Sequence, residues 1–335
     1  MFNKKNFTIL MHELTRHHYN NCDEYKKILD LVYGFKNNKD IESLPFLPAK
    51  LFKELDLKSI TDEKVFKILN SSGTSNNRPS RIFLDKENAK SQTKVLNELV
   101  SKVIGNKRIP MLIIDEKKNI QNPKNFDAKT AAILGFSIFG TNHTYLIENG
   151  RINYENLNQF LNKYSDKVFF IFGFTSFIFE NLLENLDTKK IKKNFSKGIL
   201  IHGGGWKKLE NKKISNKIFK QKLKNKLNLK KVINYYGLIE QTGSIFFECE
   251  KCETFSPSKY SNILIRDKNF SVLKKNQKGF IQLMSLLPKS YPGHNILTED
   301  IGEIVEKDCV ICNNKKKFLV HGRAEKSEIR GCSDV

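Results

Sequence analysis

A run of small, mostly hydroxylated residues follows a short apolar segment near residue 70, and its composition suits phosphate binding. The run is Ser71, Ser72, Gly73, Thr74 and Ser75, and Arg78 follows after two asparagines. Small residues and glycine let the backbone curl, so that successive N–H groups can point inward and form a nest for phosphate. The hydroxyl groups add donors and Arg78 adds positive charge. Taken alone, the segment is equally compatible with a flexible surface turn.

Four of the six cysteines form two Cys-x-x-Cys pairs, Cys249 with Cys252 and Cys309 with Cys312. Two short chelating turns brought together would give a tetrahedral site of four sulfur ligands, which suits Zn²⁺. Such a closed site leaves no position for substrate, so we expect a structural role. The two pairs are farther apart than in a compact zinc ribbon. A redox-active dithiol is the alternative interpretation.

The elements that must position these residues alternate along the chain. Three apolar runs are typical of buried strands, at residues 110–115, 167–172 and 197–201, and a helical segment at 176–186 separates the last two. This alternation predicts βαβ units and a mainly parallel sheet. Asp85 is placed to cap a following helix, and residues 220–231 form an amphipathic pattern. Six phenylalanines between 169 and 179 could line an apolar tunnel or simply form core.

Composition sets limits on the class of protein. A hydrophobic content of 39% is normal for a globular chain. The net charge of +22 suits anionic partners such as nucleotides, nucleic acid or a membrane surface. Lysines are scattered along the whole chain, however, so compositional bias explains the charge as well. The most apolar runs, 131–140 and 168–174, are shorter than the roughly 20 residues of a membrane helix. Without a secretory signal at the N-terminus, we expect a cytoplasmic protein.

The serine-rich run resembles the phosphate loop of the adenylate-forming superfamily, which includes the acyl-CoA synthetases. Tyr235-Tyr-Gly-Leu-Ile-Glu240 resembles its second signature. The resemblance implies that ATP is the cofactor, that Tyr236 and Gly237 belong to the adenine site, and that Glu240 holds Mg²⁺ on the phosphates. It also implies that Asp300 binds the ribose hydroxyls and that Arg323, in His321-Gly-Arg323, reaches the ribose and phosphates.

The chain also resembles, over essentially its whole length, the LuxE-type acyl-protein synthetases of bacterial luminescence systems. The motifs that carry this likeness include Leu14-Thr-Arg-His-His-Tyr19, Leu44-Pro-Phe-Leu-Pro48, His202-Gly-Gly-Gly-Trp-Lys207 and Arg330-Gly-Cys-Ser333. The likeness implies an α/β fold, the large domain of the superfamily with mixed, mainly parallel sheets. It implies that the enzyme makes acyl-AMP, acylates its own Cys332 and hands the acyl group to a partner such as a reductase or carrier. His202, Gly203 and Gly204 would shape a loop against adenine or the acyl carbonyl.

Two departures from the superfamily's pattern affect these expectations. The usual Gly and Lys at the end of the phosphate loop are replaced by Asn76, Asn77 and Arg78, and Arg78 could supply the charge. The sequence ends soon after the hinge-like Gly322-Arg323, so the small C-terminal domain with its catalytic lysine is expected to be lacking. Lys207 is the candidate for the missing cation.

The resulting prediction is an ATP- and Mg²⁺-dependent ligase for a fatty or other carboxylic acid, with structural zinc. Its parts would be a helical segment packed on the core at 1–60, an α/β adenylation core at 61–245, and a β-rich part at 246–335. This last part would hold the zinc site, the hinge-like end and the acyl-accepting tail. Two alternatives remain: a basic zinc-containing nucleic-acid-binding protein, which would leave the ordered ATP signatures unexplained, and an adenylate-forming scaffold that binds without turnover.

Overall fold

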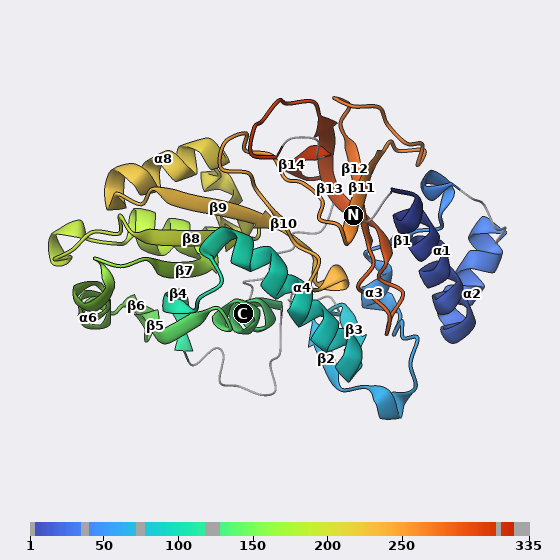
Figure 1. Ribbon diagram of the computed structural model, residues 1–335, viewed down its shortest axis with the longest axis horizontal. Helices are drawn as coiled ribbons and strands as arrows, with labels where there is room; N and C mark the ends of the chain where they lie inside the picture. Colours follow the sequence, from blue (N-terminus) through green and yellow to red (C-terminus); the bar gives the residue numbers. More distant parts are fainter. Residues whose placement is uncertain (1–3, 35–39, 72–77, 118–127, 313–315, 325–335) are drawn as a thin grey trace. The chain divides into compact units, whose positions relative to one another are not determined.

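The computed structural model describes residues 4–34, 40–71, 78–117, 128–312 and 316–324 (Figure 1). These residues form two compact units. One unit holds the described residues up to Leu96 and those from Gly237 onward, and the other holds Asn97–Tyr236. The boundary between them falls within helix α4 (Lys86–Ile104). Ser72, Gly73, Thr74, Ser75 and Cys332 lie outside the described residues.

The Asn97–Tyr236 unit is built on a mostly parallel sheet. Its strands follow the order β9-β8-β7-β4-β5-β6. Their bounds are β4 Ile109–Glu116, β5 Gly140–Glu148, β6 Arg151–Ile152, β7 Phe169–Phe174, β8 Gly198–Gly203 and β9 Lys231–Tyr236. Only β6 pairs antiparallel, with β5, among these strands. The predicted mainly parallel sheet is therefore confirmed, and its strands end at a common edge.

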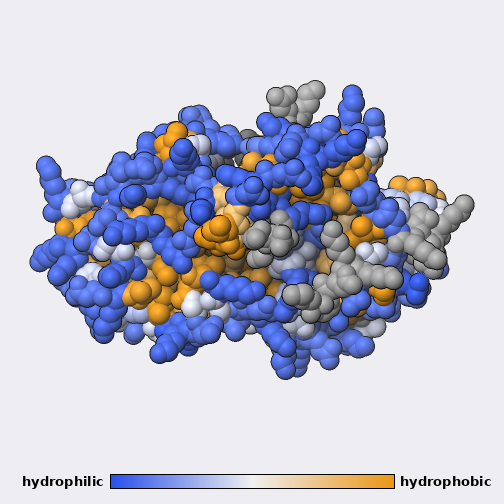
Figure 2. All heavy atoms as spheres, turned by 45° about the horizontal axis from the view of Figure 1, so that its top comes forward, coloured by the Kyte–Doolittle hydropathy of each residue, from blue (hydrophilic) through white to orange (hydrophobic). Residues whose placement is uncertain are grey.

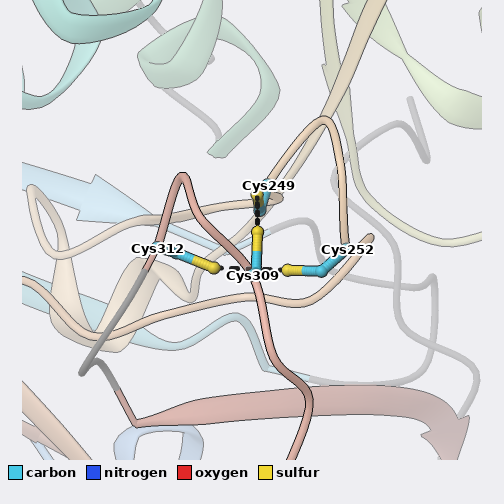
Figure 3. A group of neighbouring side chains, drawn as sticks. All are labelled: Cys249, Cys252, Cys309 and Cys312. Carbon is cyan, nitrogen blue, oxygen red and sulfur yellow. Dashed lines mark hydrogen bonds between the residues drawn. The ribbon is translucent and has the colours of Figure 1, made fainter.

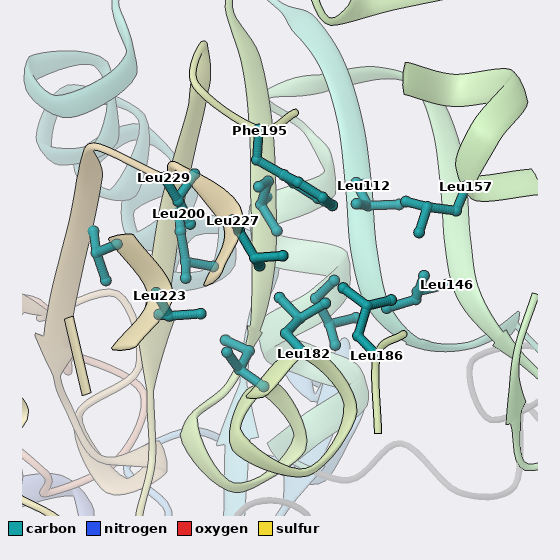
Figure 4. Packing of buried hydrophobic residues seen from close by; sticks show 14 of the residues in the cluster. Leu112, Leu146, Leu157, Leu182, Leu186, Phe195, Leu200, Leu223, Leu227 and Leu229 are labelled. Carbon is teal, nitrogen blue, oxygen red and sulfur yellow. The ribbon is translucent and has the colours of Figure 1, made fainter. Parts of the chain in front are cut away.

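Helices cover both faces of this sheet, which explains why its central strands are apolar throughout. Every residue of β7 is buried, as expected for a parallel strand covered on both sides. On one face, Leu112, Phe169 and Leu200 pack against the helices α6 (Tyr154–Tyr164), α7 (Thr175–Ile178), η5 (Phe179–Glu184) and α8 (Asn216–Leu227) (Figure 4). On the other, Phe136 of α5 (Ala128–Ser137) stacks on Phe172 at 4.3 Å between ring centroids. The phenylalanines of β7 are thus part of a packed core.

Polar residues set the ends of the helices in this unit. Asn153 caps α6 by accepting a hydrogen bond from the Asn156 N–H, and Ser215 caps α8 in the same way through Ile218. Asn228 ends α8 in the left-handed conformation, with φ of 56°, which asparagine tolerates. The amphipathic helix predicted near 220–231 therefore begins and ends earlier in the chain.

The other unit contains an antiparallel sheet with a layer of helices. Strands β11 (Ser261–Arg266), β12 (Gly279–Ser285), β13 (Asn295–Val305) and β14 (Lys317–Arg323) pair in sequence, and β1 (Leu47–Pro48) pairs parallel with β13. Helix α1 (Lys4–Asn21) packs Phe7, Met11 and Leu14 against Leu264 and Met284 of this sheet. The predicted N-terminal helices are present as α1 and α2 (Asp23–Ile28).

A separate antiparallel hairpin in the same unit joins β2 (Lys67–Asn70) to β3 (Arg81–Leu84). Asp85 accepts a hydrogen bond from the Asn88 N–H at 2.7 Å, which confirms its capping of α4. The remaining short elements are η1 Leu29–Tyr33, η2 Ile41–Ser43, α3 Leu51–Glu54, η3 Asp62–Lys64, η6 Thr188–Lys190, η7 Lys207–Lys212, η8 Ile239–Gln241 and β10 Phe246–Phe247.

The surface carries much of the chain's charge. Hydrophilic residues predominate on the face shown in Figure 2, with smaller apolar areas between them. Within the described ranges, no helix combines the length and the apolar character that crossing a bilayer would require.

Candidate active site

The serine-rich run predicted to bind phosphate connects the two strands of the β2–β3 hairpin, and the base of that connection is pinned by two serines. The Ser71 N–H donates to the Ser80 carbonyl at 2.9 Å, and the Ser80 N–H donates back to Ser71 Oγ at 2.7 Å. The hydroxyl of Ser71 therefore caps the strand end rather than pointing away from it. Residues 72–77, including the other four members of the run, lie outside the described residues.

Glu240 is joined directly to this hairpin base. It lies in η8, its side chain is 2% exposed, and its Oε1 accepts a hydrogen bond from Ser80 Oγ at 2.8 Å. The neighbouring Gln241 fixes the local backbone, because its Nε2 donates to the carbonyls of Leu283 and Gly293. A buried carboxylate offers the hard oxygen ligands that Mg²⁺ prefers. The two segments are 160 residues apart in the chain.

Arg78 is engaged with an acidic residue at the same hairpin. Its Nη2 lies 3.0 Å from Asp56 Oδ1, and Arg81 Nη1 lies 2.5 Å from Asp56 Oδ2. One carboxylate thus faces two guanidinium groups. The Arg78 side chain is about half exposed, so it can exchange this partner for a phosphate group.

Asp300 and Arg323 are brought together by the pairing of β13 with β14. They are direct register partners, and Arg323 Nε lies 4.0 Å from Asp300 Oδ1. Arg323 also pairs with Glu299 through Nη2. A guanidinium group and carboxylates side by side on a strand pair can hold the hydroxyls of a sugar by donating and accepting hydrogen bonds. The two residues are far apart in the sequence and become neighbours through the pairing of β13 with β14.

In the Asn97–Tyr236 unit, His202 lies at the carboxyl edge of the parallel sheet, near the end of β8. Its Nδ1 is 3.0 Å from Thr175 Oγ1, and the Thr175 hydroxyl donates to the Gly203 carbonyl at 3.1 Å. Because that hydroxyl gives its one proton to Gly203, Nδ1 of His202 carries a proton and donates to threonine. Burial lowers the pKa of His202 to about 3, and the positive charge of Lys220 adds to this. The imidazole is therefore neutral near pH 7.

Two glycines next to His202 leave room for neighbouring aromatic rings. A Cβ on Gly203 would stand 2.5 Å from the ring of Tyr235 on the adjacent strand. Gly204 has φ of +80°, which favours glycine. Tyr235 in turn packs on Phe136 at 5.3 Å between centroids. Tyr236 ends β9, Gly237 follows it, and Lys207 is the first residue of η7.

An ion pair at the same sheet edge was not predicted from the sequence. Lys129 Nζ lies 3.0 Å from Asp115 Oδ2, and their side chains are only 4% and 1% exposed. Lys129 also lies 4.2 Å from the centre of the Phe177 ring. An acidic residue at the end of an apolar strand, Asp115, is the one feature in the sequence that could have drawn attention to this site. No local pattern pairs it with a lysine 14 residues later.

The four cysteines of the two Cys-x-x-Cys pairs converge in the unit that holds β13 and β14. Their sulfur atoms all lie within 4.8 Å of one another (Figure 3). Cys252, Cys309 and Cys312 are buried, and Cys249 is partly exposed. Backbone N–H groups of Cys312 and Ile311 donate to Cys309 and help lower the pKa of its thiol to about 6. The sequence prediction that these residues form one cluster is confirmed.

Solved structures with the same fold are adenylate-forming enzymes. A crystal structure of 2-hydroxyisobutyryl-CoA ligase in the postadenylation state matches with a TM-score of 0.74 at 12% identity, over 95% of this chain and 67% of that chain. ATP-bound MatB from Rhodopseudomonas palustris matches with a TM-score of 0.51 at 13% identity, over 79% of this chain and 49% of that one. The fold is therefore that of the adenylate-forming superfamily, as the sequence predicted.

Sequence comparison narrows the class to a family. The model of the family described as "Acyl-protein synthetase, LuxE" matches residues 3–335. The chain belongs to this LuxE acyl-protein synthetase family, and it is an acid ligase of the adenylate-forming kind. The long-chain-fatty-acid–luciferin-component ligase of Aliivibrio fischeri is 24% identical over 89% of this chain and 79% of its own length. The Vibrio harveyi enzyme of the same name is also 24% identical, over 88% of this chain and 78% of its own length.

Proposed function

We propose that this enzyme activates a long-chain fatty acid with ATP, transfers the acyl group to its own Cys332 and then passes it to an acceptor protein. The observation that carries the proposal is the buried Glu240, hydrogen-bonded through Ser80 to the base of the serine-rich hairpin loop. This arrangement suits the binding of a nucleoside triphosphate together with Mg²⁺. The names of the two bacterial relatives, which describe ligation of a long-chain fatty acid, support the choice of acid.

In the first step, a carboxylate oxygen of the fatty acid attacks the α-phosphorus of ATP and pyrophosphate leaves. The N–H groups of Ser72, Gly73, Thr74 and Ser75 would hold the phosphates together with the hydroxyls of the serines and the threonine, including that of Ser71, and Arg78 would add charge. Glu240 would hold Mg²⁺, which neutralises the triphosphate and the departing pyrophosphate. Lys207 would stabilise negative charge that builds up on the transferring phosphate.

The rest of the nucleotide would be held by two groups of residues. Asp300 and Arg323, neighbours across the β13–β14 pair, would bind the ribose. Gly203, Gly204, Tyr236 and Gly237 would form the adenine site together with His202. Because the His202 imidazole is buried and neutral, its role is to bind and shape the loop rather than to exchange protons.

In the second step, the thiolate of Cys332 attacks the acyl carbonyl, the bond to the phosphate breaks and AMP leaves. Acyl-AMP is a mixed anhydride with a good leaving group, and a thiolate is a much stronger nucleophile than a thiol. Arg330, two residues before Cys332, would favour the thiolate. The thioester keeps the acyl group activated, so a nucleophile on the acceptor protein, such as a reductase or carrier, can take it without more ATP.

The test uses the purified enzyme with ATP, Mg²⁺ and a radiolabelled long-chain fatty acid. We expect label on the protein that hydroxylamine releases, as a thioester requires. The label should disappear in Cys332→Ser, while pyrophosphate release persists through slow loss of acyl-AMP. Cys22→Ser is the matched control, because Cys22 is 2% exposed and burial raises its pKa to about 11. Label that survives in Cys332→Ser would refute the assignment of the nucleophile.

A further inference from the structure

We propose that Cys249, Cys252, Cys309 and Cys312 bind one Zn²⁺ ion, and that this ion fastens the loop between β13 and β14 to the segment after β10. The metal site goes beyond the proposed ligase activity. Any effect of the metal on nucleotide binding rests on the roles proposed above for Asp300 and Arg323. The binding of the metal itself does not depend on those roles.

The sulfur positions match the geometry of a tetrahedral metal site. Cys249 and Cys309 sulfurs are 3.7 Å apart, and those of Cys252 and Cys312 are 3.3 Å apart. A tetrahedron with zinc–sulfur bonds of about 2.3 Å has sulfur–sulfur edges of about 3.8 Å. Each of these two distances joins a cysteine of one pair to a cysteine of the other. All four sulfur atoms lie within 4.8 Å of one another, as one cluster (Figure 3).

The backbone around each pair is shaped in the same way. The N–H groups of Lys251 and Cys252 donate to the Cys249 sulfur, and those of Ile311 and Cys312 donate to the Cys309 sulfur. In both turns the first cysteine thus accepts from the second and third residues after it. The two turns therefore present their first cysteine in the same local arrangement.

The first turn also adopts a conformation that an ordinary side chain disfavours. Glu253, directly after Cys252, has φ of 56°, and its N–H donates to the Cys249 carbonyl at 2.9 Å. With this positive φ, Glu253 closes the turn that holds Cys249 and Cys252. The conformation is disfavoured by about 1 kcal/mol or more for a residue other than glycine, so the surrounding contacts must maintain it.

Four cysteine sulfur ligands in a closed, largely buried cluster favour zinc over hard cations, which prefer oxygen ligands. The paired turns leave no open coordination position, so a structural role follows. The competing interpretation is a redox centre in which Cys249 bonds to Cys309 and Cys252 to Cys312. That arrangement would link the same two segments without any metal, and metal analysis separates the two cases.

One of the two segments joined by the cluster leads directly into β14, the strand that contains Arg323. Residues 306–316 connect β13 to β14 and contain Cys309 and Cys312. Lys307 Nζ donates to the Cys252 carbonyl at 2.7 Å. Phe318, fully buried in β14, exchanges two backbone hydrogen bonds of 3.0 Å with Phe255. The cluster therefore fixes the start of β14.

Arg323 lies at the other end of the same strand, opposite Asp300. Six residue steps along a strand span about 20 Å, so the metal does not touch these side chains. It acts on them through the pairing of β14 with β13, which sets their register. Without the metal, we expect β14 to separate from β13 more often and the pair of side chains to lose its geometry.

The experiment combines metal analysis with amide hydrogen exchange on the full-length enzyme. Purified protein should contain one zinc per chain by mass spectrometry, and the double variant Cys249→Ser/Cys309→Ser should contain less than about a tenth of that. Cys22→Ser, which alters a buried cysteine outside the cluster, should keep its zinc. Removing zinc from the wild-type protein with a chelator should speed exchange in β13 and β14 at least about tenfold and leave β7 and β8 unchanged. Restoring zinc should reverse the effect.

Each result decides a separate part of the proposal. Protein produced with added zinc that holds almost none, or that yields disulfides between the pairs, would overturn the metal site. Bound zinc whose removal leaves exchange in β14 unchanged would overturn its fastening role. Both readouts are independent of acid-dependent pyrophosphate chemistry, so a failed ligase assay would leave them intact.

Discussion

Lowering the pH should reduce the free energy of unfolding, because buried histidines resist protonation in the folded enzyme. The size of this loss follows from how far burial lowers their pKa. His18 and His294 are fully buried in the unit that contains α1, with ring centroids 4.7 Å apart. His294 Nε2 lies 3.0 Å from Thr15 Oγ1. Burial lowers the pKa of both residues, that of His294 from 6.5 to about 3.

The sign follows from the two pKa values. The unfolded chain takes up a proton on His294 near pH 6.5, while the folded chain resists this protonation until about pH 3. Stability is therefore fully present above the unfolded pKa and is lost as the pH falls below it. Between about pH 7 and about pH 5, His294 alone removes about 2 kcal/mol of unfolding free energy, a large share of a typical total. His18, whose pKa burial also lowers, adds to this loss.

The assay is urea unfolding at these two pH values for the wild type, His294→Asn and His143→Asn. The loss between the two pH values should be about 2 kcal/mol smaller in His294→Asn, whatever the variant's absolute stability. The exposed His143 serves as the control, and its variant should keep the wild-type loss. An equal loss in His294→Asn would show that His294 is not held neutral, and would refute the reasoning.

Two substitutions test the proposed nucleotide site. In Gly203→Ala the new Cβ would meet the Tyr235 ring at 2.5 Å, and overpacking of this size should raise the KM for ATP about tenfold or more; an unchanged KM would remove Gly203 from the site. Lys207→Met should slow acid-dependent pyrophosphate release at least about 100-fold, while the matched Lys208→Met should not. If the two lysine variants behave alike, the assignment of Lys207 as the replacement cation is wrong.

The strands of the parallel sheet could be predicted because a strand buried on both faces is apolar along its whole length. Runs of apolar residues marked β4, β7 and β8 to within two residues at either end. The ends of α8 were misplaced, because the cap Ser215 and the left-handed Asn228 were not recognised as its boundaries. The helix predicted at 176–186 begins at Thr175, and most of it is a π-helix, a form that no residue pattern announces.

The candidate site could be predicted as a set of residues but not as an arrangement. The motifs named Glu240, Asp300 and Arg323 individually. The hydrogen bond from Ser80 to Glu240 depends on packing between segments 160 residues apart. The pairing of Asp300 with Arg323 depends on strand register, which includes an irregularity at Ile301. Contacts of this kind are set by the whole tertiary structure and leave no local pattern. The roles assigned to these residues stay predictions. The division of the chain into parts at 1–60, 61–245 and 246–335 also stays a prediction.

The central claim is that the enzyme couples a fatty acid to AMP, and ATP–pyrophosphate exchange tests it most directly. Labelled pyrophosphate should enter ATP only when a long-chain fatty acid and Mg²⁺ are both present. Glu240→Gln keeps an oxygen for the Ser80 hydroxyl but removes the charge, and should reduce the exchange at least about 100-fold. Exchange that proceeds without the acid, or no exchange with any acid in a protein that binds ATP, would contradict the account.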